Sequence, residues 1–147
     1  MTTPTCIFVM GVSGAGKTTV GQRLSERMGC HFLDGDDFHS PENIRKMADG
    51  VPLSDDDRWP WLELIVKAIQ EKIENPPVVV ACSALKEVYR RRLAVIPYHL
   101  VYLKGQRSEI ESRIQARADH FLPVKLLTSQ FLDLEEPQNA LVAPVTW

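Results

Sequence analysis

Eight residues near the N-terminus have the types and spacing that bind a triphosphate. They read Gly11-Val12-Ser13-Gly14-Ala15-Gly16-Lys17-Thr18 and fit the pattern G-x-x-x-x-G-K-[ST]. Glycines in such a loop let backbone N–H groups turn toward phosphate oxygens that side chains would block. Lys17 adds a mobile positive charge for the β- and γ-phosphates, and the Thr18 hydroxyl suits Mg²⁺. Together with Thr19, these residues are predicted to bind a nucleoside triphosphate.

A second chemical group is the acidic loop Asp34-Gly35-Asp36-Asp37-Phe38-His39. Three carboxylates crowded into one loop repel each other unless a cation or the hydroxyl groups of a ligand share the site. A hydroxyl acceptor needs a carboxylate that hydrogen-bonds it and takes its proton during phosphoryl transfer. We expect this loop to supply that carboxylate; the alternative is a solvated acidic turn that caps a helix.

Two basic residues farther along the chain, Arg58 and Lys86, are candidate contacts of a substrate. The planar fork of Arg58 can grip a carboxylate at two points, although the aspartates beside it are also favoured at a helix N-terminus. Lys86 ends the run Cys82-Ser83-Ala84-Leu85-Lys86, whose small residues leave room for a ligand. Arg58 is therefore predicted to bind an acid, whereas Lys86 faces either substrate or solvent.

A basic helix precedes a proline-containing loop in the last third of the chain. Arg113 and Arg117 are four residues apart on one helix face, and His120 follows them. Transfer of a phosphoryl group needs cations that close over it and exclude water. We therefore predict a lid over about 113–131, the alternative being ordinary solvated charge.

Strands and helices must alternate to position these groups. The strand predicted at 6–10 directly precedes the phosphate-binding loop, and Val20, Leu24 and Met28 share one face of the helix after it. A short helix is predicted from Ser40-Pro41, with Ile44 and Met47 facing inward. Further strands are predicted at 31–33, 78–82, 99–103 and 140–145, and further helices at 57–74, after Lys86, and from a capping box at Ser108-Glu109-Ile110-Glu111 through Ile114.

This alternation predicts an α/β fold in which helices flank a parallel sheet, with residues 1–147 forming one domain. In such folds ligands bind at the carboxyl edge of the sheet, which is where both loops fall. Pro144 restricts the last strand to an edge or a strand end. The printed chain ends at Trp147, where this kind of fold normally adds a C-terminal helix. We expect the apolar surface left without that helix to lower stability or to be covered by a second copy, as in a homodimer.

The composition of the chain argues against nucleic acid and membranes as binding partners. A net charge of −2 over 147 residues gives no general attraction to nucleic acid or to an anionic membrane. The sequence has no apolar run long enough for a membrane span, and its N-terminus lacks a signal-peptide pattern, so we expect a cytoplasmic protein that acts on a small molecule. Three cysteines without a CxxC pair indicate neither a disulfide framework nor a zinc site.

Further motifs along nearly the whole chain accompany the loops described above. They are Pro41-Glu42-Asn43-Ile44, Lys46-Met47, Gly50-Val51-Pro52-Leu53, Asp55-Asp56-Asp57-Arg58-Trp59-Pro60-Trp61-Leu62, the run from Cys82 to Lys86, Tyr89-Arg90, Val101-Tyr102-Leu103-Lys104-Gly105, His120-Phe121, Ser129-Gln130-Phe131 and Leu134-Glu135-Glu136-Pro137. Together with the phosphate-binding loop and the acidic loop, in this order and at this spacing, they resemble the gluconokinase family. This family is similar in fold to shikimate and adenylate kinases, so the resemblance implies a three-layer P-loop kinase fold with a lid.

The resemblance implies ATP-dependent phosphorylation of D-gluconate to 6-phospho-D-gluconate, with Mg²⁺. Gly11 to Thr19 and Arg113 would bind the nucleotide, and Lys17 and the lid residue Arg117 would act on the phosphates. Thr18 and Asp34 would hold Mg²⁺. The residues implied to bind substrate are Asp36, which would also be the base, and His39, Arg58, Lys86 and His120, with Arg58 on the gluconate carboxylate.

Two alternatives stay open. A carboxylate base and an arginine suit any hydroxy acid, so the residues alone allow another small P-loop kinase, such as one that phosphorylates shikimate. A truncated, non-catalytic nucleotide-binding protein is the other alternative. It is motivated by the chain end and by Ala118-Asp119, where the family's lid usually has a glycine and this chain gains negative charge. A GTPase is disfavoured because no Asn-Lys-x-Asp signature is present.

Overall fold

A computed structural model describes residues 6–72, 77–116 and 124–145 of the chain. Its five strands form one sheet in the order β2-β3-β1-β4-β5, and every neighbouring pair is parallel. All five lie within one residue of their predicted bounds, and β5 is at the edge, which confirms the parallel α/β prediction. The strands are β1 (Cys6–Met10), β2 (Phe32–Asp34), β3 (Val78–Ala81), β4 (Tyr98–Lys104) and β5 (Leu141–Pro144).

The inner strands read as continuous apolar runs because both of their faces are buried. In β1, Phe8 and Met10 enter one core cluster while Val9 enters the other. In β3, Val80 packs in the same cluster as Phe8, and Val79 packs in the same cluster as Val9. The edge strand β5 differs, with Leu141 70% and Val142 50% exposed. Leu141 and Val142 are therefore accessible at this edge of the sheet, and the homodimer stays a prediction.

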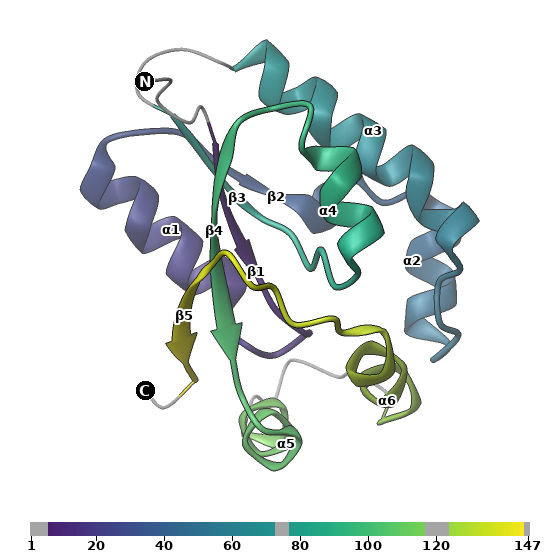
Figure 1. Cartoon of the computed structure of the whole chain (residues 1–147). Coiled ribbons are helices and arrows are strands. Elements are labelled where there is room, and N and C mark those ends of the chain that lie inside the picture. Colours follow the sequence, from purple (N-terminus) through teal and green to yellow (C-terminus); the bar gives the residue numbers. More distant parts are fainter. Residues whose placement is uncertain (1–5, 73–76, 117–123, 146–147) are drawn as a thin grey trace.

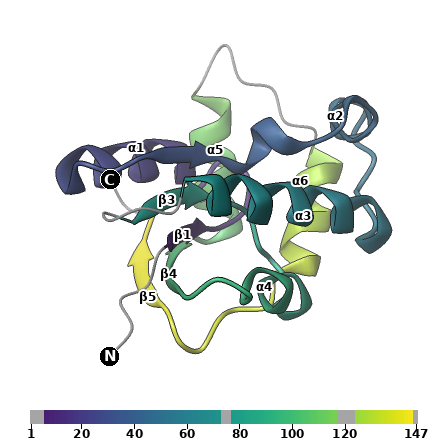
Figure 2. The ribbon, with the colours of Figure 1, turned by 90° about the horizontal axis from the view of Figure 1, so that it is seen from above.

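Helices cover both faces of the sheet. The core cluster on one face takes its helical residues from α3 and α4, and the cluster on the other face takes them from α1, α5 and α6. Figure 1 shows α1 on one side of the strands and α3 and α4 on the other, and Figure 2 shows the same separation from above. The helices are α1 (Lys17–Met28), α2 (Pro41–Ala48), α3 (Asp55–Glu71), α4 (Glu87–Leu93), α5 (Arg107–Gln115) and α6 (Val124–Asp133), with a 3₁₀ turn η1 (Gly35–Phe38) after β2.

Serine caps fix the starts of α2 and α3. Ser40 Oγ accepts a hydrogen bond from the Asn43 N–H at 3.1 Å, which confirms the predicted cap. Ser54 and Asp57 form a reciprocal capping box that starts α3 two residues before the predicted position. The corresponding box of α5 is formed by Gln106 with Glu109, so the prediction of a cap at Ser108 was wrong.

Two predicted helix faces are confirmed only in part: Val20 and Leu24 of α1 pack against the core and Met47 of α2 is half-buried, but Met28 and Ile44 are exposed because tertiary contacts differ from the apolar pattern. Ile44 is 52% exposed, and the buried residue of α2 is Asn43, whose side chain donates to the Asp57 carbonyl at 3.0 Å. Met28 is also exposed, and α1 buries Gly21, where a Cβ would lie 2.5 Å from the Phe32 ring.

The predicted stripe of α3 is confirmed where it is described: Leu62, Ile65 and Ile69 are buried and Val66 packs against them. Ile73 lies outside the described residues, and α3 ends at Glu71 rather than at the predicted residue 74. No helix of the described residues is long and apolar enough to span a membrane.

Candidate active site

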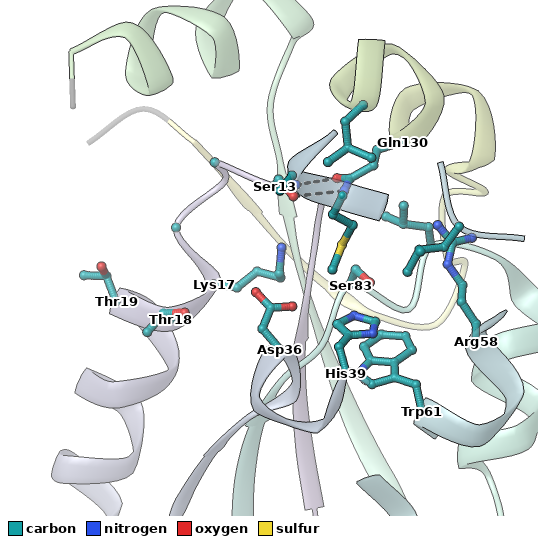
Figure 3. A pocket seen from close by; sticks show the side chains of 17 residues that line it. Ser13, Lys17, Thr18, Thr19, Asp36, His39, Arg58, Trp61, Ser83 and Gln130 are labelled. Atoms are coloured by element: carbon teal, nitrogen blue, oxygen red, sulfur yellow. Dashed lines mark hydrogen bonds between the residues drawn. The ribbon is translucent and has the colours of Figure 1, made fainter. Parts of the chain in front are cut away.

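A cavity of about 290 Å³ opens beside the carboxyl ends of β1 and β3. Its walls come from the phosphate-binding loop, η1, α2, α3, the segment between β3 and α4, and α6 (Figure 3). The chain leaves β1 for β2 and β3 on one side and later returns to β4 on the other. The site therefore lies where the strand order reverses, which is the usual ligand position in open α/β sheets.

The phosphate-binding loop is already folded around the Lys17 ammonium group. Lys17 Nζ donates to the carbonyl oxygens of Gly11 at 2.9 Å and Val12 at 3.1 Å. Burial lowers the pKa of Lys17, while the nearby carboxylates of Asp36 and Asp34 oppose the shift. Gly14 has φ +87°, and a Cβ there would lie 2.8 Å from Ile114 of α5. Glycine at this position therefore serves both the turn and the close packing of α5.

Thr18 and Asp34, the residues predicted to hold Mg²⁺, lie next to each other. Thr18 Oγ1 donates to Asp34 Oδ2 at 3.1 Å, and Asp34 Oδ1 accepts from the Asp36 N–H at 3.0 Å. Burial raises the pKa of Asp34, and the neighbouring Asp36 carboxylate adds to the rise. Among the described residues, no three His, Cys, Asp or Glu side chains gather as a complete metal site. A hydroxyl, one carboxylate, water and phosphate oxygens match the way Mg²⁺ is usually bound beside a nucleotide.

Helix α3 holds the acidic loop in place through Trp61. Trp61 Nε1 donates to the Gly35 carbonyl at 2.7 Å, and a Cβ on Gly35 would lie 2.6 Å from the Ala81 carbonyl. The ring of His39 stacks on Trp61 with centroids 4.3 Å apart. Burial lowers the pKa of His39, so its imidazole is neutral at neutral pH. Figure 3 shows Asp36 beside Lys17 and His39 above Trp61 in the same cavity.

Arg58 is buried and lines the far wall of the cavity. Its Nη1 donates to the Tyr89 hydroxyl and, at 3.2 Å, to Asp133 Oδ2. Its Nε and Nη2 make no hydrogen bond to other described residues, so part of the planar fork is available to a carboxylate ligand.

Lys86 belongs to the polar cluster behind Arg58 and does not line the cavity. Its Nζ donates to Asp55 at 3.0 Å, and this bond raises the pKa of Lys86. Asp55 also accepts from the Tyr89 hydroxyl. Substrate binding by Lys86 stays a prediction, to which these contacts add a structural role.

The structure brings only part of the predicted lid to the site. Arg113 lies on α5 and does not line the cavity, whereas Arg117 and His120 fall outside the described residues. The later part of the predicted lid is α6, a helix that the sequence analysis did not predict.

Gln130 on α6 is the site residue that sequence reasoning missed. Its Oε1 accepts from the Ser13 N–H at 2.6 Å, and its Nε2 donates to Ser13 Oγ at 2.9 Å (Figure 3). The available signal was the apolar spacing of Leu126, Leu127 and Phe131, which is that of a helix. Ser83, from the run predicted to leave room for a ligand, and Leu126, which was not predicted, also line the cavity.

A phosphate-binding loop after the central strand of a parallel sheet, facing an acidic loop across a cavity, defines a P-loop kinase of small molecules. The family model described as shikimate kinase matches residues 13–137. The gluconokinase of Gluconobacter oxydans (strain 621H) is 44% identical over 137 residues, covering 91% of this chain and 77% of that protein. The thermosensitive gluconokinase of Escherichia coli (strain K12) is 45% identical over 134 residues, covering 89% and 72%.

Solved structures agree with the sequence relatives. The crystal structure of a gluconokinase from Sinorhizobium meliloti 1021 superposes with a TM-score of 0.87 at 44% identity, covering 98% of this chain and 84% of that one. The chain therefore belongs to the shikimate kinase family and, within it, to the gluconokinases.

Proposed function

We propose that this chain transfers the γ-phosphoryl group of ATP to the primary hydroxyl of D-gluconate, giving 6-phospho-D-gluconate and ADP. One observation carries the proposal: a phosphate cradle at Lys17, a carboxylate at Asp36 and a buried guanidinium at Arg58 line one cavity. These are the groups needed to hold the donor, activate a hydroxyl and recognise an acid. The relatives described above carry the name gluconokinase, which supports gluconate as that acid.

On the donor side, N–H groups of the phosphate-binding loop other than that of Ser13, which donates to Gln130, would bind the β- and γ-phosphates together with the Lys17 ammonium. Thr18 and Asp34 would hold Mg²⁺, directly or through water, and this ion when bound neutralises charge on the phosphates. Arg113 and the lid residue Arg117 are proposed to contact the nucleotide. ATP as donor also fits the cytoplasmic location that we propose.

On the acceptor side, Arg58 would bind the gluconate carboxylate through Nε and Nη2, orienting the substrate with its far end toward Asp36. Asp36 would take the proton of the attacking hydroxyl. The oxygen–phosphorus bond to gluconate then forms as the bond between the γ-phosphorus and the bridging oxygen of ADP breaks. His39, as a neutral imidazole, and Ser83 would hydrogen-bond hydroxyl groups along the chain of the substrate. Lys86 and His120 are weaker candidates for the same role.

The test is ADP release by the purified chain with Mg·ATP and a panel of hydroxy acids. Gluconate is expected to give the highest kcat/KM, and Lys17→Ala is expected to remove most of the turnover. Activity on shikimate without activity on gluconate would overturn the substrate assignment. Nucleotide binding without turnover on any acid of the panel would instead favour a non-catalytic protein.

A further inference from the structure

Helix α6 contacts both halves of the candidate site. On its inner face Leu127 and Phe131, four residues apart, pack in the core cluster beneath the phosphate-binding loop. On its other face Leu126 and Gln130 line the cavity, and Asp133 continues that face by three residues. One short helix therefore presents neighbouring side chains to the donor side and to the acceptor side.

The donor contact is a two-point hydrogen bond. Gln130 is 8% exposed, and its amide group accepts from the Ser13 N–H and donates to the Ser13 hydroxyl. Ser13 is the third residue of the phosphate-binding loop. Any shift of this part of the loop on nucleotide binding must either move Gln130 or break both hydrogen bonds.

The acceptor contact is the ion pair of Asp133 with Arg58. Asp133 Oδ2 lies 3.2 Å from Arg58 Nη1, and the Arg58 side chain is almost completely buried. Because Nη1 is held by Asp133 and Tyr89, the orientation of the remaining Nε and Nη2 depends on where Asp133 sits. The two carboxylates and two ammonium or guanidinium groups of this cluster, Asp55, Asp133, Arg58 and Lys86, balance in charge before any substrate arrives.

The end of α6 is attached to the rest of the domain. The Glu135 N–H donates to the Leu85 carbonyl at 2.8 Å, and Arg90 Nη2 donates to the Glu135 carbonyl at 2.9 Å. The Glu87 N–H, at the start of α4, donates to Glu135 Oε1 at 2.7 Å. These bonds fix the chain directly after α6, and within α6 Gln130 and Asp133 are three residues apart on one face, so the helix itself carries a displacement of Gln130 to Asp133.

We propose that Gln130 and Asp133 are positioning residues through which α6 couples nucleotide binding to binding of the acid substrate. Nucleotide in the phosphate-binding loop fixes Ser13, Gln130 fixes α6, and Asp133 sets the Arg58 fork for the substrate carboxylate. Thermodynamic linkage makes the effect reciprocal, so the acid must tighten nucleotide binding by the same factor. The inference rests on the proposed function, since it takes the acid to be gluconate.

The test is isothermal titration of gluconate with and without Mg²⁺ and the non-hydrolysable analogue AMPPNP. In the wild type the analogue is expected to lower the gluconate Kd by at least about five-fold. Gln130→Met removes both bonds to Ser13 at nearly constant length, and Asp133→Asn removes the charge while keeping an acceptor. Each is expected to bring the ratio of Kd values close to one, and the double variant is expected to change it no further, because both links act in series.

Two further variants keep the result interpretable. Leu132→Ala alters an 81% exposed residue of the same helix and is expected to keep the wild-type ratio. Ser13→Ala removes only the hydroxyl bond to Gln130, keeps the N–H bond, and is expected to lower the ratio partway even if Gln130→Met fails to fold. A wild-type ratio near one, or an unchanged ratio in Ser13→Ala, Gln130→Met or Asp133→Asn, overturns the inference.

Gluconate-dependent ADP release measured on the same wild-type samples distinguishes failure of the coupling through α6 from failure of the proposed function. Turnover together with unchanged ratios in the variants refutes the coupling through α6 and leaves the proposed function standing. Absence of gluconate turnover and binding in the wild type refutes the proposed function, and the inference with it.

Discussion

Gly14→Ala is the substitution for which the structure gives the sharpest expectation. Gly14 lies in the phosphate-binding loop with φ +87°, a conformation that alanine adopts only with strain. An added Cβ would also lie 2.8 Å from Ile114 Cγ1 and 2.9 Å from its Cδ1, closer than carbon atoms pack. The substitution therefore adds backbone strain and a steric overlap at one point of the site.

The size of the effect follows from these two parts. Alanine in the left-handed region costs about 1–2 kcal/mol. The overlap with Ile114 is an overpacking of the kind that costs about 1–3 kcal/mol. The free energy of unfolding is therefore expected to fall by roughly 2–5 kcal/mol. If the loop relieves part of this by moving, the phosphates lose their N–H donors, and a displacement of about 1 Å lowers turnover on the order of 100-fold.

Urea unfolding and steady-state ADP release measure the two consequences. A double-mutant cycle that combines Gly14→Ala with Ile114→Ala separates the steric overlap from the backbone strain, because the shorter side chain at 114 relieves the overlap and leaves the φ strain. The double variant is thus expected to be more stable than the sum of the two single destabilisations predicts. Wild-type unfolding and wild-type kcat/KM for ATP in Gly14→Ala would refute this account of the loop.

Three further predictions concern the metal, the acidic loop and pH. Asp34→Asn is expected to raise the Mg²⁺ concentration for half-maximal ADP release by about 10- to 100-fold, because the carboxylate positions the ion. Trp61→Phe leaves the buried Gly35 carbonyl without its donor and is expected to lower the free energy of unfolding by about 1–3 kcal/mol in urea titrations. For Asp57, the Ser54 N–H and then a lysine ammonium hold the pKa of the carboxyl below its ordinary value of 3.8. Its stabilisation is fully present well above 3.8 and is lost as pH falls through the depressed pKa, so the destabilisation by Asp57→Asn is expected to be largest at about pH 7 and to shrink as pH falls below 3.8.

Each of these has a clear contrary result. An unchanged Mg²⁺ requirement in Asp34→Asn would remove that residue from the metal site. A Trp61→Phe protein as stable as the wild type would mean that another donor satisfies the Gly35 carbonyl. A cost of Asp57→Asn that stays the same as pH falls below 3.8 would show that side-chain shape rather than charge supports the start of α3.

The sheet could be predicted because its determinants are local. The runs containing Phe8 and Val80 are apolar on both faces, and they belong to inner strands of a covered sheet. Ser40 and Ser54 cap helices through residues three positions away, so the sequence alone carries that signal. The inward face of α2 could not be predicted in this way, because Asn43 is buried against a carbonyl fourteen residues later.

The candidate site divides in the same manner. The phosphate-binding loop follows from motif spacing, and its closeness to the acidic loop follows from the rule that parallel strands end at one edge, whereas Asp34 as the partner of Thr18 came from the family resemblance. Gln130 bonds Ser13 across 117 residues, and Asp133 bonds Arg58 across 75, so no local pattern links them. Sequence reasoning thus predicts the phosphate-binding loop and misses α6, the helix that contacts that loop through Gln130.

The most direct test of the central claim is the identity of the product formed from Mg·ATP and D-gluconate, followed by ³¹P nuclear magnetic resonance. The account predicts one phosphomonoester on the primary hydroxyl of gluconate, formed in equal amount with ADP and almost absent with Asp36→Asn. ADP formed at the same rate without gluconate, or a phosphomonoester formed from shikimate and not from gluconate, would contradict it.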